Sequence, residues 1–503
     1  MLAIQGHSRR LCDGVHRRDV LRAAGTGLLG TSLSGLLAVE ESGSVLQPRA
    51  KSVMFLFLFG GPSQLDTFDM KPQAAQQIRG PYQPIASRSP GLQMCEHLPQ
   101  LANLSDQYAV IRTMTHQQND HNACHIIQTG HAMPPAERGP ARVNATEIDW
   151  PAYGSVVEYL DQQSDHLRPP EQRRDFPSFV YLPNRLGHIQ GYDRSGQYGG
   201  WLGRSYSPLA TKVGKRDAKD NPYFRDCTEQ DLNFRVEGVE SHADVTVDRL
   251  NRRVSLLDQF DTARRELDSS SRVRDFGRLR ERALDLVTSP KMRAAFDLSS
   301  ESPQLRDRYG RHLFGQSVLM GRRMIEAGAR FVTVLWDSPD GYGWDSHGHS
   351  NDVKNHLLPG LDQSLAALLT DLKDRGLLDE TLIVCLGEMG RTPKQDTAQW
   401  GRGHWSYCFP AVLAGAGIRG GAVYGRSDKD SAFPHEKPVS PEALGATIFQ
   451  ALGIPPETRL HDAFGRPVSV IEGGEPLRCW ICLVRDRKCC RPSSFLAAQN
   501  WAG

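Results

Sequence analysis

Continuous runs of apolar residues recur along this chain, without the alternation of apolar and polar positions that a half-exposed strand shows. The first run, KSVMFLFLF, covers residues 51–59. A run this uniform is expected of a strand that is buried on both faces of a parallel sheet. Similar runs occupy residues 108–114, 178–183, 330–336, 381–386 and 409–414. The pattern therefore predicts six buried strands.

Amphipathic segments lie between several of these runs. The clearest is PGLDQSLAALLTDLKDRGLL, in which Leu361, Leu365, Leu368 and Leu372 recur at helical spacing and Gly376 closes the pattern. Helices that alternate with buried strands are typical of a doubly wound α/β fold. We therefore expect a mainly parallel central sheet with helices packed against it.

The region between about residues 184 and 300 differs in composition from the rest. A loop rich in glycine and tyrosine, GYDRSGQYGGWLGRSYSP, comes first, and a strongly charged segment follows it. The charged segment is expected to form paired helices. We interpret the region as an insertion that covers the carboxyl edge of the sheet, within a domain spanning residues 50–475.

The amino-terminal stretch HRRDVLRAAGTGLLGTSLSGLLAVEE joins Arg17 and Arg18 to a moderately apolar, glycine-rich segment that ends near Val39. This pattern predicts a twin-arginine signal over residues 1–39, read by the twin-arginine export machinery, and hence a periplasmic or secreted protein. The segment is shorter than the roughly 20 apolar residues of a membrane-spanning helix. The alternatives are an uncleaved membrane anchor and an amphipathic helix.

The carboxyl-terminal residues 478–503 form a cysteine-rich tail. The stretch CWICLVRDRKCC holds Cys479, Cys482, Cys489 and Cys490. Because this spacing fits no common zinc-binding pattern well, we expect a disordered tail, with a zinc knuckle as the alternative.

The net charge of the chain indicates which classes of partner it is expected to bind. The chain has 60 basic and 58 acidic residues among 503, a formal net charge of +2. A basic excess is the usual electrostatic mark of a nucleic-acid-binding protein, and it is missing from this sequence. We therefore predict no nucleic-acid partner.

Residues that can bind a metal follow the first predicted strands. Asp66 lies in the loop GGPSQLDTFDMKP after the first strand, and Asp120 and His121 lie in THQQNDHNACHIIQTGH after the second. The run at 330–336 opens into WDSPDGYGWDSHGHS, which holds Asp337, Asp340, Asp345, His347 and His349.

The last two predicted strands add further candidates. Glu388 and Arg391 lie in GEMGRTP, directly after the strand at 381–386, and His404 lies in GRGHW, just ahead of the strand at 409–414. Ligands of open α/β sheets bind at the carboxyl ends of the strands, so these loops are expected to share one site. Mixed carboxylate and imidazole groups suit zinc, manganese or iron better than calcium, which prefers oxygen ligands.

A metal bound at such a site would favour hydrolysis. A divalent metal would acidify a bound water or polarise an ester oxygen, and Arg391 could clamp an anionic oxygen beside it. The alternative is a purely structural cluster of hydrogen bonds at the crowded edge of the sheet.

Six long motifs occur in a fixed order: GGPSQLDTFDMKP, WDSHGHS, LLPGLDQSLAALLTDL, GLLDETLIVCLGEMGRTP, GRGHW and LAGAGIRGG. In these motifs the chain resembles the bacterial family called domain of unknown function 1501, from about residue 50 to about residue 475. That family looks like a branch of the alkaline phosphatase and sulfatase superfamily. The resemblance implies an α/β/α sandwich with divalent metals at the carboxyl edge of the sheet, and hydrolysis of phosphate or sulfate esters.

The resemblance also implies particular metal ligands. Asp66 would take the place of the superfamily's first metal-binding aspartate. Asp345 and His349 match its Asp-x-x-x-His motif, although we expect the narrower family to use His347. His404 would match the late histidine ligand.

Departures from the superfamily pattern concern the nucleophile. The sulfatase motif Cys-x-Pro-x-Arg is absent, and Cys124 lacks its proline and arginine. Asp120, followed by His121, falls in the slot of the nucleophile, where no serine or threonine stands. Glu388 replaces the aspartate of an Asp-His-Gly motif, and Met389 removes its histidine. A metal-activated water is therefore expected in place of a covalent intermediate.

These observations predict an exported metal-dependent hydrolase that acts on a phosphate or sulfate ester of a small molecule or polysaccharide. The expected catalytic residues are Asp120, His121 and Arg391. The expected ligands of the zinc, manganese or iron are Asp66, Asp345, His347, His349, Glu388 and His404. The alternative is a non-catalytic exported binding protein on the same fold.

Overall fold

The computed structural model describes residues 47–133, 144–188, 191–236, 289–337, 343–348 and 350–477. The chain divides into two compact units, residues 1–47 and 48–503, and the second contains every element described below. The predicted export signal, the charged part of the insertion and the cysteine-rich tail lie outside the described residues. No helix within the described ranges is long and apolar enough to cross a membrane.

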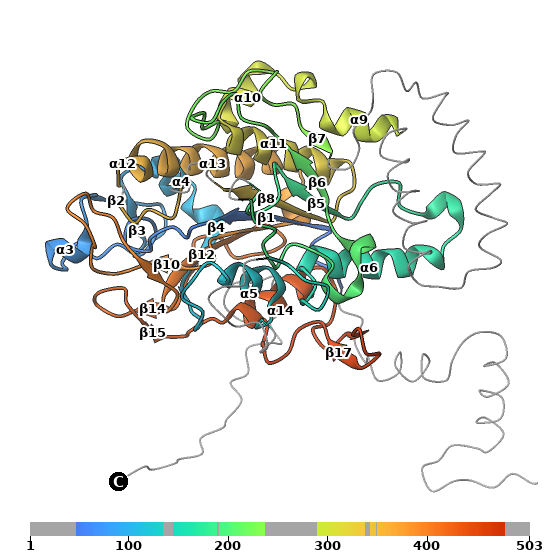
Figure 1. Cartoon of the computed structure of the whole chain (residues 1–503). Coiled ribbons are helices and arrows are strands. Elements are labelled where there is room, and N and C mark those ends of the chain that lie inside the picture. The colour runs from blue at the N-terminus through green and yellow to red at the C-terminus, as the bar shows by residue number, and fades with distance from the viewer. Residues whose placement is uncertain are drawn as a thin grey trace, which may run out of the picture. The chain divides into compact units, whose positions relative to one another are not determined.

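Nine strands form one sheet, in the order β13–β4–β12–β9–β1–β8–β5–β6–β7 (Figure 1). Their bounds are β1 Ser52–Leu58, β4 Tyr108–Met114, β5 Phe179–Leu182, β6 Leu209–Lys212, β7 Arg235–Val236, β8 Phe331–Trp336, β9 Thr381–Leu386, β12 Phe409–Ala414 and β13 Val423–Tyr424. The six strands predicted from apolar runs are all confirmed, as β1, β4, β5, β8, β9 and β12.

The sheet is mainly parallel, with β1 at its centre between β8 and β9. Strand β12 runs against both of its neighbours, with Phe409 opposite Met114 of β4 and Ala411 opposite Leu386 of β9. Because Met114 and Leu386 end their strands, the first residues of β12 lie at the carboxyl edge of the parallel strands. The loop before β12 therefore meets the loops that follow β1, β4, β8 and β9.

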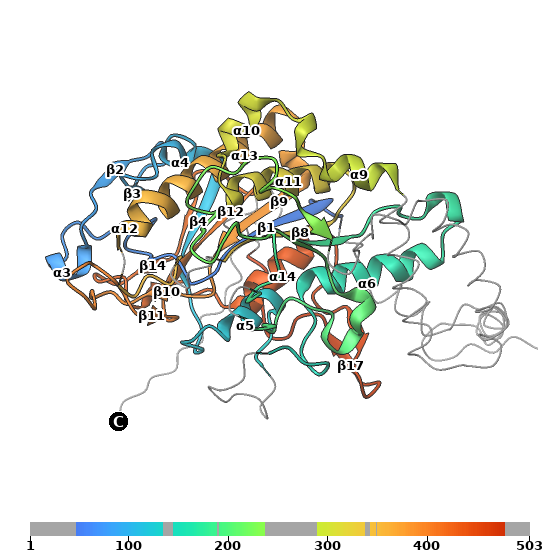
Figure 2. The ribbon, with the colours of Figure 1, turned by 45° about the horizontal axis from the view of Figure 1, so that its top comes forward.

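Helices cover both faces of the sheet (Figures 1 and 2). Alternate residues of β1 enter two separate cores, since Met54 and Leu56 pack with α11 and α13, whereas Phe55 and Phe57 pack with α6 and α14. This two-sided burial explains the unbroken apolar runs, and the α/β/α architecture is confirmed. The main helices are α4 Pro99–Asn103, α5 Ala123–Thr129, α6 Tyr153–His166, α9 Pro290–Phe296, α10 Pro303–Tyr309, α11 Leu313–Glu326, α13 Leu358–Asp374 and α14 Pro441–Ala451.

Local sequence sets where several helices begin and end. Ser289, Ser302 and Ser440 each precede a proline, and each side chain accepts a hydrogen bond from the backbone N–H three residues later. Serine at the N-cap followed by proline is a favourable helix start. At the end of the predicted leucine-rich helix, α13, Gly376 takes a left-handed φ of 70°.

Short elements complete the fold. They are α3 Gln76–Arg79, α12 Ser350–Asp352, a π-helical turn Val353–Leu357, and four two-stranded ribbons: β2 Pro84–Ala86 with β3 Gln93–Cys95, β10 Gly390–Arg391 with β11 His404–Trp405, β14 Arg426–Ser427 with β15 Pro434–Glu436, and β16 Arg459–His461 with β17 Pro467–Ser469.

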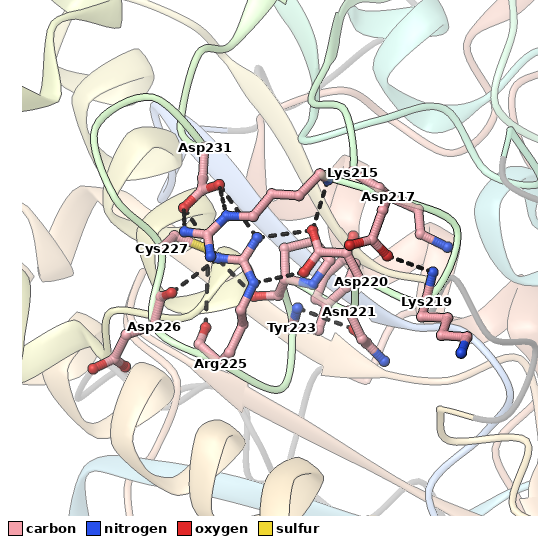
Figure 3. A network of polar contacts seen from close by, with 12 residues as sticks. Lys215, Asp217, Lys219, Asp220, Asn221, Tyr223, Arg225, Asp226, Cys227 and Asp231 are labelled. Atoms are coloured by element: carbon pink, nitrogen blue, oxygen red, sulfur yellow. Dashed lines mark hydrogen bonds and ion pairs between the residues drawn. The ribbon is translucent and has the colours of Figure 1, made fainter.

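The described part of the predicted insertion adds strands β6 and β7 to the edge of the sheet, which the sequence did not predict. Beyond β6, a loop is closed by ion pairs of Arg225 with Asp220 and Asp231, at 2.6 and 3.0 Å (Figure 3). The closed loop holds the Tyr223 ring against Trp336, with their centroids 6.0 Å apart. This part of the insertion thus packs onto the end of β8.

Candidate metal centre

Four side chains meet at the carboxyl edge of the sheet: His121, Asp345, His347 and His404. His121 lies between β4 and α5, Asp345 and His347 lie between β8 and α12, and His404 lies in β11, ahead of β12. Asp345 is central, with Oδ2 3.0 Å from His121 Nε2 and Oδ1 3.2 Å from His404 Nε2. The antiparallel course of β12 is what brings His404 to this edge.

The donor atoms around Asp345 Oδ1 are spaced like metal ligands. His347 Nε2 lies 3.0 Å from this oxygen and 3.0 Å from His404 Nε2. Tetrahedral ligands at about 2.0–2.1 Å from a zinc ion are about 3.3 Å apart, close to these separations. The spacing of these two imidazoles and one carboxylate therefore fits a divalent transition metal.

His347 supplies the open side of this donor set, because 51% of its side chain is exposed. Partial burial, together with the positive charge of Arg391, lowers the pKa of His347 despite the nearby Asp345 carboxylate. The ring is therefore neutral at pH 7, which is the form that binds a metal.

His121 lies between two carboxylates. Its Nδ1 is 2.7 Å from Glu388 Oε1, and its Nε2 faces Asp345. Burial acts to lower the pKa of His121, but the hydrogen bonds to Asp345 and Glu388 outweigh it and raise the pKa to about 9. Both ring nitrogens of His121 thus carry protons at neutral pH in the metal-free protein. Within the described residues, one set of donor atoms close enough to share an ion consists of His121, Asp345 and His404.

Arg391 forms a buried ion pair with Asp345. Its side chain is 0% exposed, and Nη2 lies 2.7 Å from Asp345 Oδ1. The same guanidinium donates to the backbone carbonyls of Gly60, Gly61 and Arg402. Burial acts to raise the pKa of Asp345, but bonds to His121 and His404 and the charge of Arg391 hold it well below its usual range. The structure therefore directs the donors of Arg391 toward Asp345 and the backbone.

Glu388 is also fully buried. Both of its carboxylate oxygens accept from the backbone N–H of Gly60, at 3.0 and 3.1 Å. Gly60 has a φ of 107°, and a Cβ there would lie 2.2 Å from the backbone nitrogen of Asp345. The glycine therefore lets the loop after β1 touch the loop that carries Asp345.

Other predicted site residues lie elsewhere. Asp66 pairs with the buried Arg402, with Oδ2 2.9 Å from Nε, and is not part of the cluster around Asp345. The Asp120 carboxylate accepts from the Asn122 backbone N–H and the Gln118 side chain, so it stabilises the turn that carries His121. His349 and Asp340 lie outside the described residues.

Asp337, the first residue after β8, is buried and accepts a hydrogen bond from the Gly187 backbone N–H at 3.0 Å. Burial raises the pKa of Asp337 to about 6, although Gly187 and the positive charge of Arg194 oppose the shift. Asp337 anchors the loop after β5 to the end of β8.

Replacing Asp337 by asparagine is expected to stabilise the protein at pH 8 by about 2 kcal/mol. Because the folded pKa is raised, the stability associated with this carboxyl is present in acid and lost as the pH rises through about 6. An asparagine side chain does not ionise, so the variant does not lose this stability as the pH rises. Its side-chain oxygen can still accept the hydrogen bond from the Gly187 N–H. Urea unfolding at pH 5 and pH 8 measures the effect. An equal gain at both pH values would contradict the assignment.

Some residues that support the site through packing were not predicted from the sequence. The Phe59 ring lies 4.9 Å from the His121 ring, centroid to centroid. Arg402 pairs with Asp66 and also donates hydrogen bonds to three backbone carbonyls. It lies in the GRGHW motif, but no role was predicted for it. Its position two residues before His404 was the available signal.

Cys124 is buried in α5, and its thiol donates to the Ser195 carbonyl. Burial raises the pKa of Cys124 to about 12. A thiol in this state is not a nucleophile, in agreement with the missing sulfatase motif.

The family of this chain follows from its match to one family model. Residues 50–481 match the model described as protein of unknown function, DUF1501. The chain belongs to the DUF1501 family. The predicted family is thus confirmed over most of the chain, including the whole described part of the site. A search of curated proteins finds no match.

Solved structures similar to this DUF1501 protein are distant. The phosphonate monoester hydrolase SpPMH from Silicibacter pomeroyi is 12% identical, with a TM-score of 0.31 over 85% of this chain and 75% of that chain. The PsFucS1 sulfatase from Pseudoalteromonas sp. is 11% identical, with a TM-score of 0.34 over 87% and 72%. A protein in the alkaline phosphatase superfamily from Vibrio parahaemolyticus is 11% identical, with a TM-score of 0.33 over 82% and 68%. Likenesses at this level do not determine an activity.

Proposed function

We propose that this DUF1501 protein is an exported hydrolase that binds a divalent transition metal through Asp345, His347 and His404 and cleaves a phosphate or sulfate ester. The observation that carries the proposal is the triangle of Asp345 Oδ1, His347 Nε2 and His404 Nε2, with sides of 3.0–3.2 Å. Two imidazoles with one carboxylate suit zinc, manganese or iron.

When bound, the metal would polarise an ester oxygen and lower the pKa of a water. The other steps depend on residues of the chain. Asp345 keeps its negative charge because Arg391 and the histidines hold it, and the exposed side of His347 leaves room for a substrate. His121, whose Nε2 lies 3.0 Å from Asp345 Oδ2, would supply the proton to the leaving oxygen.

Arg391 and Asp120 act as positioning residues in this proposal. Arg391 fixes the orientation of the Asp345 carboxylate, and Asp120 fixes the turn that carries His121. Partners behind metal ligands commonly affect metal affinity about 10–100-fold.

The second candidate is an exported binding protein that uses the same centre without chemistry. It is favoured by the burial of Cys124 and the local hydrogen bonds of Asp120, since neither side chain is available as a covalent nucleophile.

Metal content tests the proposal. The full-chain protein, supplied with zinc, manganese and iron, is expected to retain one of these metals in plasma mass spectrometry and to hydrolyse aryl phosphate or aryl sulfate. His404→Ala is expected to lose both the metal and the turnover. His435→Ala, a change at an exposed histidine of β15, serves as the matched control and is expected to keep both.

Two results would overturn the proposal. Folded wild-type protein without metal would refute the centre, and a His404→Ala protein with full metal content would refute its ligand set. Metal without any ester turnover would favour the binding protein.

A further inference from the structure

His404, one of the three proposed ligands, lies in a strand of only two residues. Strand β11 pairs with β10 in an antiparallel ribbon, with Arg391 opposite His404. Next to this pair, the Thr392 N–H donates to the Gly403 carbonyl at 2.9 Å. Because backbone groups of successive residues point to opposite edges of a strand, the His404 carbonyl points away from β10. A two-stranded ribbon is marginally stable by itself, so the position of His404 depends on what binds the other edge of β11.

The other edge of β11 is bound by the side chain of Asn119, from the loop after β4. Asn119 Nδ2 donates to the His404 carbonyl at 3.3 Å, and Oδ1 accepts from the Ser406 backbone N–H at 2.9 Å. A carbonyl and the N–H two residues later are the pair of groups that one residue of a neighbouring parallel strand would bind. The Asn119 amide, which offers both a donor and an acceptor, thus takes the place of such a residue.

The loop that carries Asn119 is itself fixed to the site. The His116 backbone N–H donates to the Ser406 carbonyl at 3.0 Å. His116 Nδ1 accepts from the Gln118 backbone N–H at 3.2 Å, so Nε2 carries the ring proton and donates to the Glu388 carbonyl at 2.7 Å. Asn119 therefore projects from a backbone that is held on both sides of β11, and its amide is pre-organised for the two hydrogen bonds.

The same loop continues into His121, two residues after Asn119. The rings of His121 and His404 lie 4.5 Å apart, centroid to centroid. His404 Nε2 lies 3.0 Å from His347 Nε2 and 3.2 Å from Asp345 Oδ1. Metal ligands must keep their distances within a few tenths of an ångström. A shift of the His404 backbone would move the imidazole out of this range.

We propose that Asn119 is a positioning residue of the candidate metal centre, whose side-chain amide fixes the backbone of β11 so that the His404 ring meets Asp345 and His347; this inference rests on the function proposed above. Asn119 is exposed, so its replacement removes the two hydrogen bonds without opening a cavity in either core. The effect on the metal centre can therefore be measured on folded protein.

The zinc affinity of the full-chain protein, measured by competition with a chelator, tests the inference. Asn119→Ala and the nearly isosteric Asn119→Leu are each expected to bind zinc at least tenfold more weakly than the wild type. Gln117→Ala changes an exposed residue of the same loop and is expected to keep the wild-type affinity. Wild-type zinc affinity in both Asn119 variants would overturn the inference.

Nuclear magnetic resonance of protein with isotope-labelled histidine provides a second readout, which needs no metal. The ring signals of His404 are identified by their loss in His404→Ala. They are expected to shift in both Asn119 variants and to stay in place in Gln117→Ala. Unshifted His404 signals in the Asn119 variants would refute the positioning role.

These readouts, together with ester turnover, separate the two proposals. A wild type that binds no zinc would refute the proposed metal centre, and the His404 signals would then decide whether Asn119 positions this histidine. Zinc affinity lost in the Asn119 variants, beside a wild type that binds zinc without ester turnover, would refute the hydrolase and support Asn119 as a positioning residue.

Discussion

Replacing Asp345 by asparagine is expected to weaken metal binding by about 100-fold or more and to abolish ester hydrolysis. Oδ1 of Asp345 contacts His347, His404 and Arg391, so its charge is shared by every group of the proposed centre. The amide keeps the shape but removes the charge that a metal needs. It also leaves the buried Arg391 without its carboxylate.

Competition with a chelator measures the affinity, and urea unfolding of the metal-free protein measures stability. Asp374→Asn, at the exposed end of α13, is the matched control and is expected to match the wild type in both. Asp345→Asn protein that bound metal with wild-type affinity would show that Asp345 is not a ligand.

Replacing Gly60 by alanine is expected to destabilise the protein by about 3 kcal/mol or more and to disrupt the metal centre. Two separate costs add at this position. The φ of 107° is unfavourable for any residue with a Cβ, and that Cβ would lie 2.2 Å from the Asp345 backbone nitrogen. The clash is with backbone, so it can be relieved only if the two loops move apart, which separates Asp345 from the loop after β1.

The Gly91→Ala variant measures the cost of the left-handed φ without the steric clash. Gly91 also has a left-handed φ, 79°, but nothing lies within 4 Å of its added Cβ. We expect it to lose about 1 kcal/mol in urea unfolding and to keep its metal affinity. Equal losses of stability in the two variants, with metal affinity intact in both, would show that the contact between the two loops does not matter.

The central strands were predictable from the chain alone. Residues of β1 alternate between two cores, as Phe55 and Leu56 illustrate, and both faces exclude water. Burial on both faces requires apolar side chains at every position, so a buried strand appears in the sequence as an unbroken run. The same reasoning found β4, β5, β8, β9 and β12. It missed β6, whose sequence LATK ends in the exposed Lys212, and β7, which has only two residues, because neither forms an unbroken apolar run.

The direction of β12 could not be predicted from the sequence. Nothing in FPAVLA distinguishes an antiparallel strand from a parallel one, since direction is set by pairing with β4 and β9. That direction places His404 at the carboxyl edge, beside Asp345 and His347, which lie nearly 60 residues earlier in the sequence. The family motifs pointed to His404, but the physical reason for its position lies in the topology of the sheet.

The kinds of residue that form the site could be recognised from the sequence, because aspartate, glutamate and histidine cluster at the ends of apolar runs. The tertiary structure decided which of them meet. It brought His121, Asp345, His347 and His404 within hydrogen-bonding distance, and it paired Asp66 with Arg402 instead. Partners of a charged group come from loops that are distant along the chain, and their distances depend on how the strands pair, so sequence spacing alone could not assign them.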